Sequence, residues 1–469
     1  MSAAMFTLTE ALQWVAGGKL VGDGSVAVRR VYTDTRTLQP GDLFVAIRGE
    51  NFDANDFLAD AKARGAVAAI AHPGRLPPGL PGVEVADTRI ALGALGAGWR
   101  HRFSLPLVAV TGSNGKTTVT QMIASILHAW QPDGMLATQG NFNNDIGLPL
   151  QLLRLRPQHR VAVLELGMNH PGEIGYLATL VRPTVALVNN AQREHQEFMA
   201  TVEAVARENG SVLASLPASG VAVFPTGDEF TSLWKQLAGA RACMTFGAVE
   251  AATAAGGDDA DIVLAGTEWI GGHWQVSVKT PAGPVAYRLH IAGRHNVRNS
   301  LAAVACALAA GVPLAAISRG LEAFEPVKGR SRALAVSLGE RTLTLVDDTY
   351  NANPDSVRAA VDVLAALPAP RLLVLGDMGE VGDQGPQFHA EAGEHARASG
   401  IEHFFTLGQQ SSVMKGRHFA SIEALNAAVL AELPRVASVL VKGSRFMKME
   451  RVIEAITALA QQQESGHAA

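Results

Sequence analysis

Only two cysteines, Cys243 and Cys306, occur in this chain of 469 residues. So few thiols exclude a fold held together by disulfides and a zinc site built on cysteine, and they indicate buried thiols in a reducing compartment. The first residues have no basic stretch followed by a long apolar core, so they predict no signal peptide. We therefore expect a cytoplasmic protein.

Positive charge is not in excess either. Lys and Arg number 39 against 43 Asp and Glu, which gives a net charge of −4 and no global basic field that would attract nucleic acid. The uncharged stretch 299–318 is rich in Ala and is interrupted by Gly311-Val312-Pro313, so it predicts a buried helix that ends at Gly311 and not a membrane span. We expect a monomer that binds no nucleic acid and has no membrane span.

What the chain does have is a series of short apolar segments that alternate with helical patterns, which is typical of α/β domains. Residues 1–85 predict a small α/β domain with a helix capped by Thr9 and strands at 26–32, 43–47 and 67–71. A linker helix at 88–102 opens the central domain, 86–312. Its predicted strands lie at 107–110, 135–138, 161–166, 185–189 and 220–224, with a helix at 201–214 and a small antiparallel addition within 255–290.

A third α/β domain is predicted for residues 313–469. Its strand candidates are 343–346, 372–375, 403–407 and 439–441. A helix starts at Asn353-Pro354, because Pro is favoured in the first turn and apolar residues then recur on one face. The terminal helix is predicted for 447–459, with a frayed end from residue 461 onward.

Residues 111–118 read Thr-Gly-Ser-Asn-Gly-Lys-Thr-Thr and follow the apolar run 107–110. A strand, a tight glycine-containing loop and a helix that follows Lys-Thr predict a phosphate cradle, in which loop amides face the anion, Lys116 bridges phosphate oxygens and the Thr117 hydroxyl binds Mg²⁺. The general P-loop pattern has Gly where this chain has Val110, so the loop is a shortened variant. A chance Gly-Lys-Thr is the alternative, and the flanking strand and helix argue against it.

Two titratable residues follow neighbouring predicted strands. Glu165 lies near the end of the strand at 161–166, where a carboxylate is costly unless it meets a cation. Beside a phosphate loop that cation would be Mg²⁺, with a structural salt bridge as the alternative. His195 follows the strand at 185–189. A lone His is more often structural, but its place beside the nucleotide strand favours a metal or phosphate contact.

Further polar residues cluster at helix starts and strand ends. Asn296 and Asn299 lie one turn apart and would either cap a helix or recognise adenine. Lys328-Gly329-Arg330 is a short basic turn that on its own is expected to be exposed. The segment 347–356, Asp-Asp-Thr-Tyr-Asn-Ala-Asn-Pro-Asp-Ser, is more polar than packing requires. This segment and the loop 376–380 follow strands and should face one cleft.

Together these motifs resemble the Mur ligase family of bacterial cell-wall synthesis. The resemblance runs from Thr33-Asp34-Thr35-Arg36 to the last helix. It includes the short phosphate loop, Thr138-Gln139-Gly140-Asn141, Ile146-Gly147-Leu148-Pro149, Glu165, His195 and His295-Asn296 with Asn299. The segments 347–356, 376–380 and 441–445 favour the member that adds D-alanyl-D-alanine to UDP-N-acetylmuramoyl-tripeptide.

The resemblance implies an α/β protein of three domains: a small N-terminal domain for the UDP-sugar, a central P-loop ATPase domain with a parallel sheet, and a Rossmann-like C-terminal domain for the dipeptide. It implies the use of ATP and Mg²⁺, an acyl-phosphate intermediate, and Lys116, Glu165 and His195 as catalytic residues. The implied ATP contacts are Gly112, Ser113, Asn114, Gly115, Lys116, Thr117, Thr118, Asn296, Arg330 and Asp348. The implied Mg²⁺ ligands are Thr117, Glu165 and His195, and the implied substrate contacts are Thr33, Asp34, Arg36, Asn51, Asn141, Asn143, Asn144, Tyr350 and Asn351.

The chain departs from the family pattern at two places. The family usually has a Lys, typically carbamylated and bridging to a second Mg²⁺, where this chain has Asn209; either Glu208 supplies the acidic group or the second metal is held differently. The segment 53–57 lacks a Gly-His pair that is common in the family. Competing hypotheses are a related ligase for another amino acid or for folate, a P-loop ATPase that acts as a regulator or motor, and a non-catalytic nucleotide-binding module.

Overall fold

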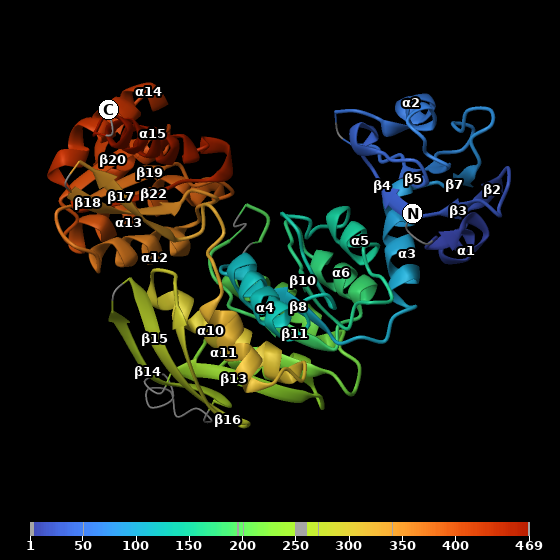
Figure 1. Cartoon of the computed structure of the whole chain (residues 1–469), viewed down its shortest axis with the longest axis horizontal. Helices are drawn as coiled ribbons and strands as arrows, with labels where there is room; N and C mark the ends of the chain where they lie inside the picture. The colour runs from blue at the N-terminus through green and yellow to red at the C-terminus, as the bar shows by residue number, and fades with distance from the viewer. Residues whose placement is uncertain are drawn as a thin grey trace.

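The computed structural model describes residues 4–49, 51–194, 197–199, 201–248, 260–270, 272–339 and 341–467. Within these residues, three larger β-sheets follow one another along the chain, and strands β1 and β3 form a further two-stranded sheet near the N-terminus. Figure 1 shows the middle part at the base of an arc, with the N-terminal and C-terminal parts on either side above it. The predicted α/β class with three domains is confirmed. The domain boundaries at 85 and 312 stay predictions.

The N-terminal sheet has the order β2-β7-β6-β5-β4. Its helix α1 (Leu8–Trp14) is capped by Thr7, so the prediction of Thr9 as the cap was wrong. Thr7 is the cap because Glu10 forms a reciprocal capping box with it. The predicted strand at 26–32 divides, since Val28 pairs with Phe6 while Val31 pairs with Leu43 in the larger sheet. The elements are β1 (Phe6–Thr7), β2 (Lys19–Val21), β3 (Ala27–Val28), β4 (Arg30–Tyr32), β5 (Asp42–Val45), α2 (Leu58–Ala63), β6 (Ala68–Ala71) and β7 (Gly82–Glu84).

In the described part of the chain, the central sheet has nine strands in the order β16-β15-β14-β13-β12-β11-β8-β10-β9. Every neighbouring pair from β14 to β9 in this order is parallel. Strands β15 and β16 extend the same sheet by antiparallel pairing, β15 with β14 and β16 with β15. The predicted antiparallel addition is thus confirmed for its described residues. The strands are β8 (Leu107–Thr111), β9 (Met135–Ala137), β10 (Val161–Glu165), β11 (Val185–Val188), β12 (Val221–Pro225), β13 (Ala242–Ala248), β14 (Ile262–Ile270), β15 (His273–Thr280) and β16 (Gly283–Leu289).

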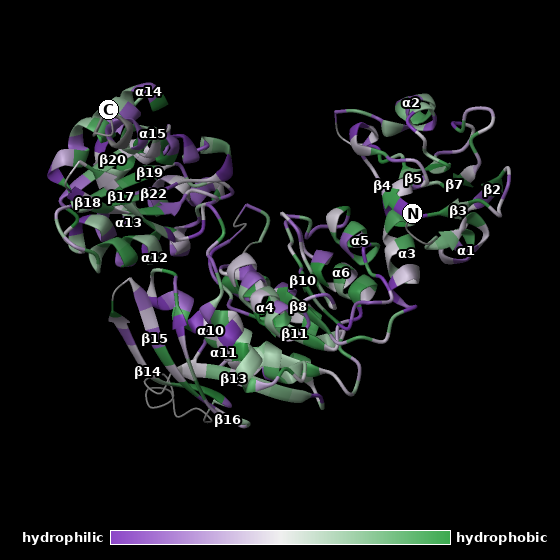
Figure 2. Ribbon diagram, in the orientation of Figure 1, coloured by the Kyte–Doolittle hydropathy of each residue, from purple (hydrophilic) through white to green (hydrophobic). Residues whose placement is uncertain are grey.

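Helices cover both faces of the central sheet, as the alternating pattern predicts. One hydrophobic core contains α4 (Lys116–Trp130), α10 (Arg294–Ala309) and α11 (Leu314–Glu322). The other contains α3 (Thr88–Arg100), α5 (Gly147–Leu152), α6 (Glu173–Val181), α7 (Val202–Ala214) and α8 (Thr231–Ala238). Figure 2 shows hydrophobic colour concentrated on the strands and inner helix faces. Helix α10 is the buried helix predicted to end near Gly311, and among the described residues no helix is long and apolar enough to cross a membrane.

The C-terminal sheet has the order β17-β18-β22-β19-β20-β21, in which only β17 and β18 pair antiparallel. Asn353 caps α12 (Pro354–Ala365) as predicted. The terminal helix α15 (Glu450–His467) begins later and ends later than predicted, because the short 3-10 turn Arg445–Met447 precedes it. The other elements are β17 (Arg332–Leu338), which was not predicted, β18 (Arg341–Asp348), β19 (Arg371–Gly376), α13 (Gly385–Ala398), β20 (His403–Leu407), β21 (Arg417–Phe419), α14 (Ile422–Glu432) and β22 (Ser438–Lys442).

Candidate functional site

A cavity of about 1360 Å³ lies between the central and C-terminal domains. Its walls come from the carboxyl ends of β8, β10 and β11 on one side and from the segments after β18 and β22 on the other, as the strand-end rule predicts. The predicted site residues that line it are Ser113, Asn114, Gly115, Lys116, Thr117, Thr118, Asn141, Asn143, Asn144, Glu165, Asn296, Arg330, Asp348, Tyr350 and Asn351.

The backbone of the phosphate loop adopts conformations that require glycine at two positions. Gly112 and Gly115 have φ of 128° and 81°, a region that side chains disfavour. A Cβ on Gly115 would lie 2.7 Å from Asn299 Oδ1, so the loop admits only glycine there. Helix α4 begins at the next residue, Lys116, and directs its first amides into the cavity. This arrangement is a preformed anion site.

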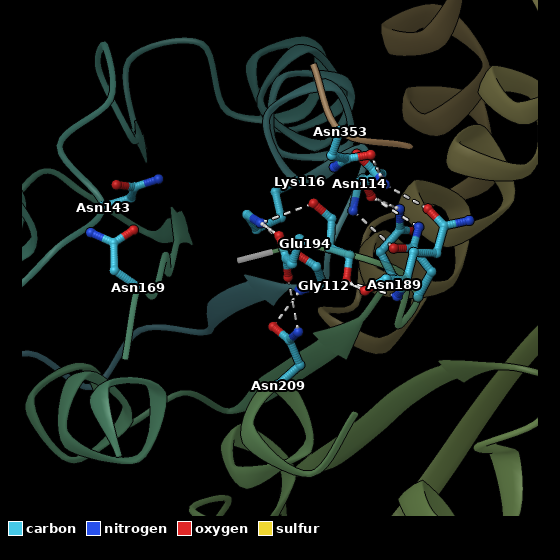
Figure 3. Close-up of polar contacts among 12 residues, drawn as sticks. Gly112, Asn114, Lys116, Asn143, Asn169, Asn189, Glu194, Asn209 and Asn353 are labelled. Carbon is cyan, nitrogen blue, oxygen red and sulfur yellow. Dashed lines mark hydrogen bonds and ion pairs between the residues drawn. The ribbon is translucent and has the colours of Figure 1, made fainter. Parts of the chain in front are cut away.

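Lys116 is folded back over the loop. Its Nζ lies 2.5 Å from Gly112 O and 3.2 Å from Ser113 O, and it forms an ion pair of 3.2 Å with Glu194 Oε2 (Figure 3). Glu194 is 5% exposed and belongs to the segment 189–194, which follows β11. Glu194 was not among the predicted site residues, although it directly precedes His195 in the sequence. His195 itself lies outside the described residues.

Asn209 supports the start of the phosphate loop from below (Figure 3). The side chain is 1% exposed; its Oδ1 accepts the backbone N–H of Gly112 at 2.9 Å, and its Nδ2 donates to Glu194 Oε1 at 3.4 Å. The neighbouring Glu208 points elsewhere, because its two oxygens accept the backbone N–H groups of Gly172 and Ile174 at the start of α6. Glu208 therefore does not supply an acidic group to the cavity, and that hypothesis is wrong.

Glu165 ends β10 and is 4% exposed. Its Oε1 accepts a hydrogen bond from Asn143 Nδ2 at 2.8 Å, and its backbone N–H donates to Thr138 Oγ1 at 2.9 Å. Because Thr117 also lines the cavity, the wall offers a hydroxyl and a carboxylate, which are the hard oxygen donors that Mg²⁺ prefers. The donor set therefore fits a magnesium ion.

A network of side-chain amides ties the phosphate loop to its surroundings. Asn114 donates its backbone N–H to Asn190 Oδ1 at 2.9 Å, and its carbonyl accepts from the amides of Asn189 and Asn190. Asn189 also donates to Asn299 Oδ1 at 3.0 Å, and Asn299 donates to Asn296 Oδ1 at 2.9 Å. Asn296 is 2% exposed and donates to Ala292 O, while Gly293 occupies the cap position of α10. The contact between Asn296 and adenine stays a prediction.

The opposite wall, from the C-terminal domain, also carries positive charge. The guanidinium carbon of Arg330 lies 4.1 Å from the centre of the Tyr350 ring, so Arg330 is half-buried and the expectation of an exposed turn was wrong for it. Asp348 accepts the N–H of Ser331 and pairs with Lys442 Nζ at 2.6 Å; Lys442 also donates to Asn351 O. Lys442 is 3% exposed and was missing from the predicted site, although its place at the end of an apolar strand could have revealed it.

The predicted UDP-sugar residues lie in the N-terminal domain, away from this cavity. Asp34 caps a 3-10 turn (Thr35–Thr37) and pairs with Arg36 at 2.7 Å. Thr33 and Asn51 lie in neighbouring loops that are half-buried or exposed, and none of these four residues lines the cavity. Their role in binding stays a prediction.

A phosphate loop at the carboxyl end of a parallel strand, opposed by a second α/β domain across a polar cleft, defines a nucleotide-binding protein of the P-loop class. Models of the Mur ligase family match three parts of the chain: the Mur ligase family, catalytic domain (residues 27–100), the Mur ligase middle domain (110–307) and the Mur ligase, glutamate ligase domain (331–466). The chain belongs to the Mur ligase family.

Individual relatives resemble nearly the whole chain. It is 40% identical to the UDP-N-acetylmuramoyl-tripeptide–D-alanyl-D-alanine ligase of Escherichia coli (strain K12) over 97% of this chain and 98% of that protein. It is 37% identical to the Haemophilus influenzae protein of the same name, over 95% and 97%. The crystal structure of MurF from Acinetobacter baumannii superposes with a TM-score of 0.88 at 35% identity, covering 97% of this chain and 99% of that one.

Proposed function

We propose that this protein joins D-alanyl-D-alanine to UDP-N-acetylmuramoyl-tripeptide with cleavage of ATP to ADP and phosphate, as a cytoplasmic, monomeric enzyme of peptidoglycan precursor synthesis. The observation that carries the proposal is the 40% identity to a ligase of this name over 97% of the chain. A regulatory or motor ATPase would turn over ATP without an acceptor, so dependence of turnover on the acceptor distinguishes it from a ligase.

In this proposal, the central domain binds the ATP phosphates. Lys116 leaves the loop carbonyls and meets the phosphate oxygens, while the amides of residues 112–118 and the N-terminus of α4 face the same charge. Asn296, Arg330 and Asp348 would complete the nucleotide site from the other walls. Thr117 and Glu165, with His195, would hold Mg²⁺, which neutralises charge on the transferring phosphoryl group.

The chemistry follows from the poor reactivity of a carboxylate. Its oxygen attacks the γ-phosphorus, ADP leaves, and an acyl phosphate forms. The amine of the dipeptide then attacks the carbonyl carbon, loses a proton, and inorganic phosphate leaves as the amide bond forms. Water must be excluded meanwhile, because it would hydrolyse the acyl phosphate. Asn141, Asn143 and Asn144 on one wall, and Tyr350 and Asn351 on the other, would hold the two peptides, while Thr33, Asp34, Arg36 and Asn51 hold the UDP-sugar.

The test is phosphate release from ATP and Mg²⁺ in the presence of UDP-N-acetylmuramoyl-tripeptide, with and without D-alanyl-D-alanine, and with D-Ala, D-Glu or L-Ala as alternative acceptors. We expect release that requires both substrates and equals the peptide product formed. Release that is indifferent to any acceptor would sink the ligase proposal in favour of a simple ATPase.

A further inference from the structure

Arg193 makes the most extensive ion-pair contact between the two walls of the cleft that we find in the described residues. Its guanidinium contacts both carboxylate oxygens of Asp355, with Nη2 at 2.7 Å from Oδ1, and its backbone N–H donates to Oδ2 at 2.8 Å. A second ion pair of 3.0 Å joins it to Glu391, and the guanidinium lies 5.2 Å from the centre of the Phe388 ring. One side chain from the central domain thus holds α12 and α13 of the C-terminal domain.

The segment that carries Arg193 is itself fastened to the phosphate loop. On one side of Arg193, the Gln192 N–H donates to Ser113 Oγ at 2.9 Å and its Oε1 accepts from Asn114 Nδ2 at 2.6 Å. On the other side, Glu194 pairs with Lys116. The phosphate loop, the segment 189–194 and the first turn of α12 therefore form one continuous polar chain.

A second contact joins the phosphate loop directly to the start of α12. Asn353, the cap of α12, donates from Nδ2 to Asn114 Oδ1 at 2.9 Å (Figure 3). Asn353, Pro354 and Asp355 also end the polar segment 347–356, which contains Tyr350 and Asn351. Any shift of Asp355 relative to Arg193 must therefore shift this segment relative to the phosphate loop.

We propose that Arg193 is a positioning residue that clamps the first turn of α12 onto the segment 189–194, and so keeps the dipeptide-binding wall in register with the phosphate loop during acyl transfer. The inference rests on the proposed function for its kinetic consequences, but the clamp itself is a property of the two domains. Arg193 contacts no reacting atom in this scheme; it acts through Asp355 and through its neighbours Gln192 and Glu194.

The physical case depends on geometry and partial burial. The Arg193 side chain is 27% exposed and that of Asp355 is 22% exposed, so the pair is shielded from solvent far better than a surface ion pair. Arg193 meets one carboxylate through Nε, Nη2 and its backbone N–H, and a second carboxylate through Nη1. Such a set of contacts resists sliding, which a single contact would allow. Closing the cleft this way also limits the entry of water beside the acyl phosphate.

The experiment compares Arg193→Ala, Asp355→Asn and the double variant with the unmodified protein in the complete ligation reaction. For each single variant we expect kcat/KM for D-alanyl-D-alanine to fall about 10-fold to 100-fold, and more phosphate to be released per peptide formed. The dissociation constant of a non-hydrolysable ATP analogue should change less than about threefold, because the phosphate loop remains intact. The double variant should be no worse than either single variant.

Controls separate the clamp from a general loss of structure. Arg207→Ala removes an exposed ion pair with Glu203 on α7 and should leave every readout unchanged. Arg193→Lys keeps the positive charge but lacks the planar guanidinium with its several donors. Its kcat/KM for D-alanyl-D-alanine should lie between the values of the unmodified protein and Arg193→Ala. Strictly additive losses in the double variant, or an unchanged ratio of phosphate to peptide in both single variants, would overturn the proposal.

A second readout does not depend on turnover. Small-angle X-ray scattering with the ATP analogue bound should show a larger radius of gyration for Arg193→Ala than for the unmodified protein, since the C-terminal domain is no longer held. Equal radii would contradict the clamp even where the protein ligates. If the unmodified protein failed to ligate, the proposed function would fail, while the scattering comparison would still decide whether Arg193 fastens the domains.

Discussion

The Oδ1 atom of Asn209 accepts the backbone N–H of Gly112 at 2.9 Å, across 97 positions of sequence. Gly112 opens the phosphate loop, and Lys116 Nζ contacts its carbonyl. The buried side-chain amide of Asn209, on α7, therefore holds the first peptide unit of the phosphate loop in place. Through Nδ2 it also contacts Glu194, the partner of Lys116. The position that departs from the family pattern has a definite structural task in this chain.

Asn209→Ala should weaken nucleotide binding. The substitution leaves the N–H of Gly112 without its acceptor in a buried place, which costs the folded protein about 1–3 kcal/mol and loosens the loop. Because nucleotide binding must then reorder the loop, we expect affinity for a non-hydrolysable ATP analogue to fall, by up to about 150-fold. Isothermal titration calorimetry measures it. Asn209→Asp keeps an acceptor for Gly112 but places a second carboxylate beside Glu194, and should also bind more weakly because of like-charge repulsion. Unchanged affinity in both variants would mean that the loop needs no support from α7.

The ligation rate should not depend on carbon dioxide, because the residue at position 209 cannot be carbamylated. A carbamate forms on an uncharged amine, and the amide nitrogen of Asn209 has no basic lone pair with which to form one. We therefore expect the same ligation rate in buffer depleted of carbon dioxide and in buffer with added bicarbonate. A rate that rises with bicarbonate would point to a carbamylated lysine elsewhere in the cleft.

Lys442→Met should destabilise the C-terminal domain. Lys442 Nζ lies 2.6 Å from Asp348 Oδ2, and the side chains are 4% and 15% exposed, so removal of the cation leaves a poorly solvated carboxylate. We expect the free energy of unfolding in urea to fall by about 3 kcal/mol. Adding Asp348→Asn should recover part of the loss. The matched control is Lys328→Met, which removes an exposed pair with Glu454 and should change stability little.

The elements that the sequence predicts best are those with a strong local pattern. Strand β8, the glycines of the phosphate loop and helix α4 follow from apolar runs and turn chemistry within about 25 residues. The cap of α1 was misassigned because Thr7 and Thr9 are both acceptable caps, and only the reciprocal contact with Glu10 distinguishes them. Similarly, the run 26–32 has one apolar pattern, but a change of sheet at Arg29 divides it.

The long-range polar contacts of the site were beyond prediction from local pattern. Arg193 meets Asp355 across 162 positions, and nothing near either residue indicates that partner. The partner of Glu165 was expected to be a cation, and the structure supplies the Asn143 amide beside it. Burial of Asn209 depends on how α7 packs against the phosphate loop, which hydrophobic periodicity does not encode.

The stability of the loop that follows β19 should depend on pH through His389. This side chain is fully buried; its Nδ1 donates to Gly385 O at 2.7 Å, and its Nε2 accepts the N–H of Met378 at 2.9 Å. The bond to Met378 requires the neutral ring, because a protonated Nε2 cannot accept a hydrogen bond. Burial lowers the pKa of His389, and the bond to Gly385 O only partly opposes that shift. Because the folded pKa lies below the unfolded value of about 6.5, the contribution to stability is complete above that pH and is lost as the pH falls through it toward the folded pKa.

The variant His389→Gln isolates this effect, since a Gln amide can make similar bonds without titrating. We expect the melting temperature of the unmodified protein to fall more steeply than that of His389→Gln between about pH 7.5 and about pH 5.5. His128→Gln, at an exposed position on α4, should leave the slope unchanged. Parallel curves for the unmodified protein and His389→Gln would show that the ring is not held neutral. Because Gly379, Glu380 and Val381 line the cleft directly after Met378, the same acid pH that loosens His389 should also weaken the wall of the ligation site.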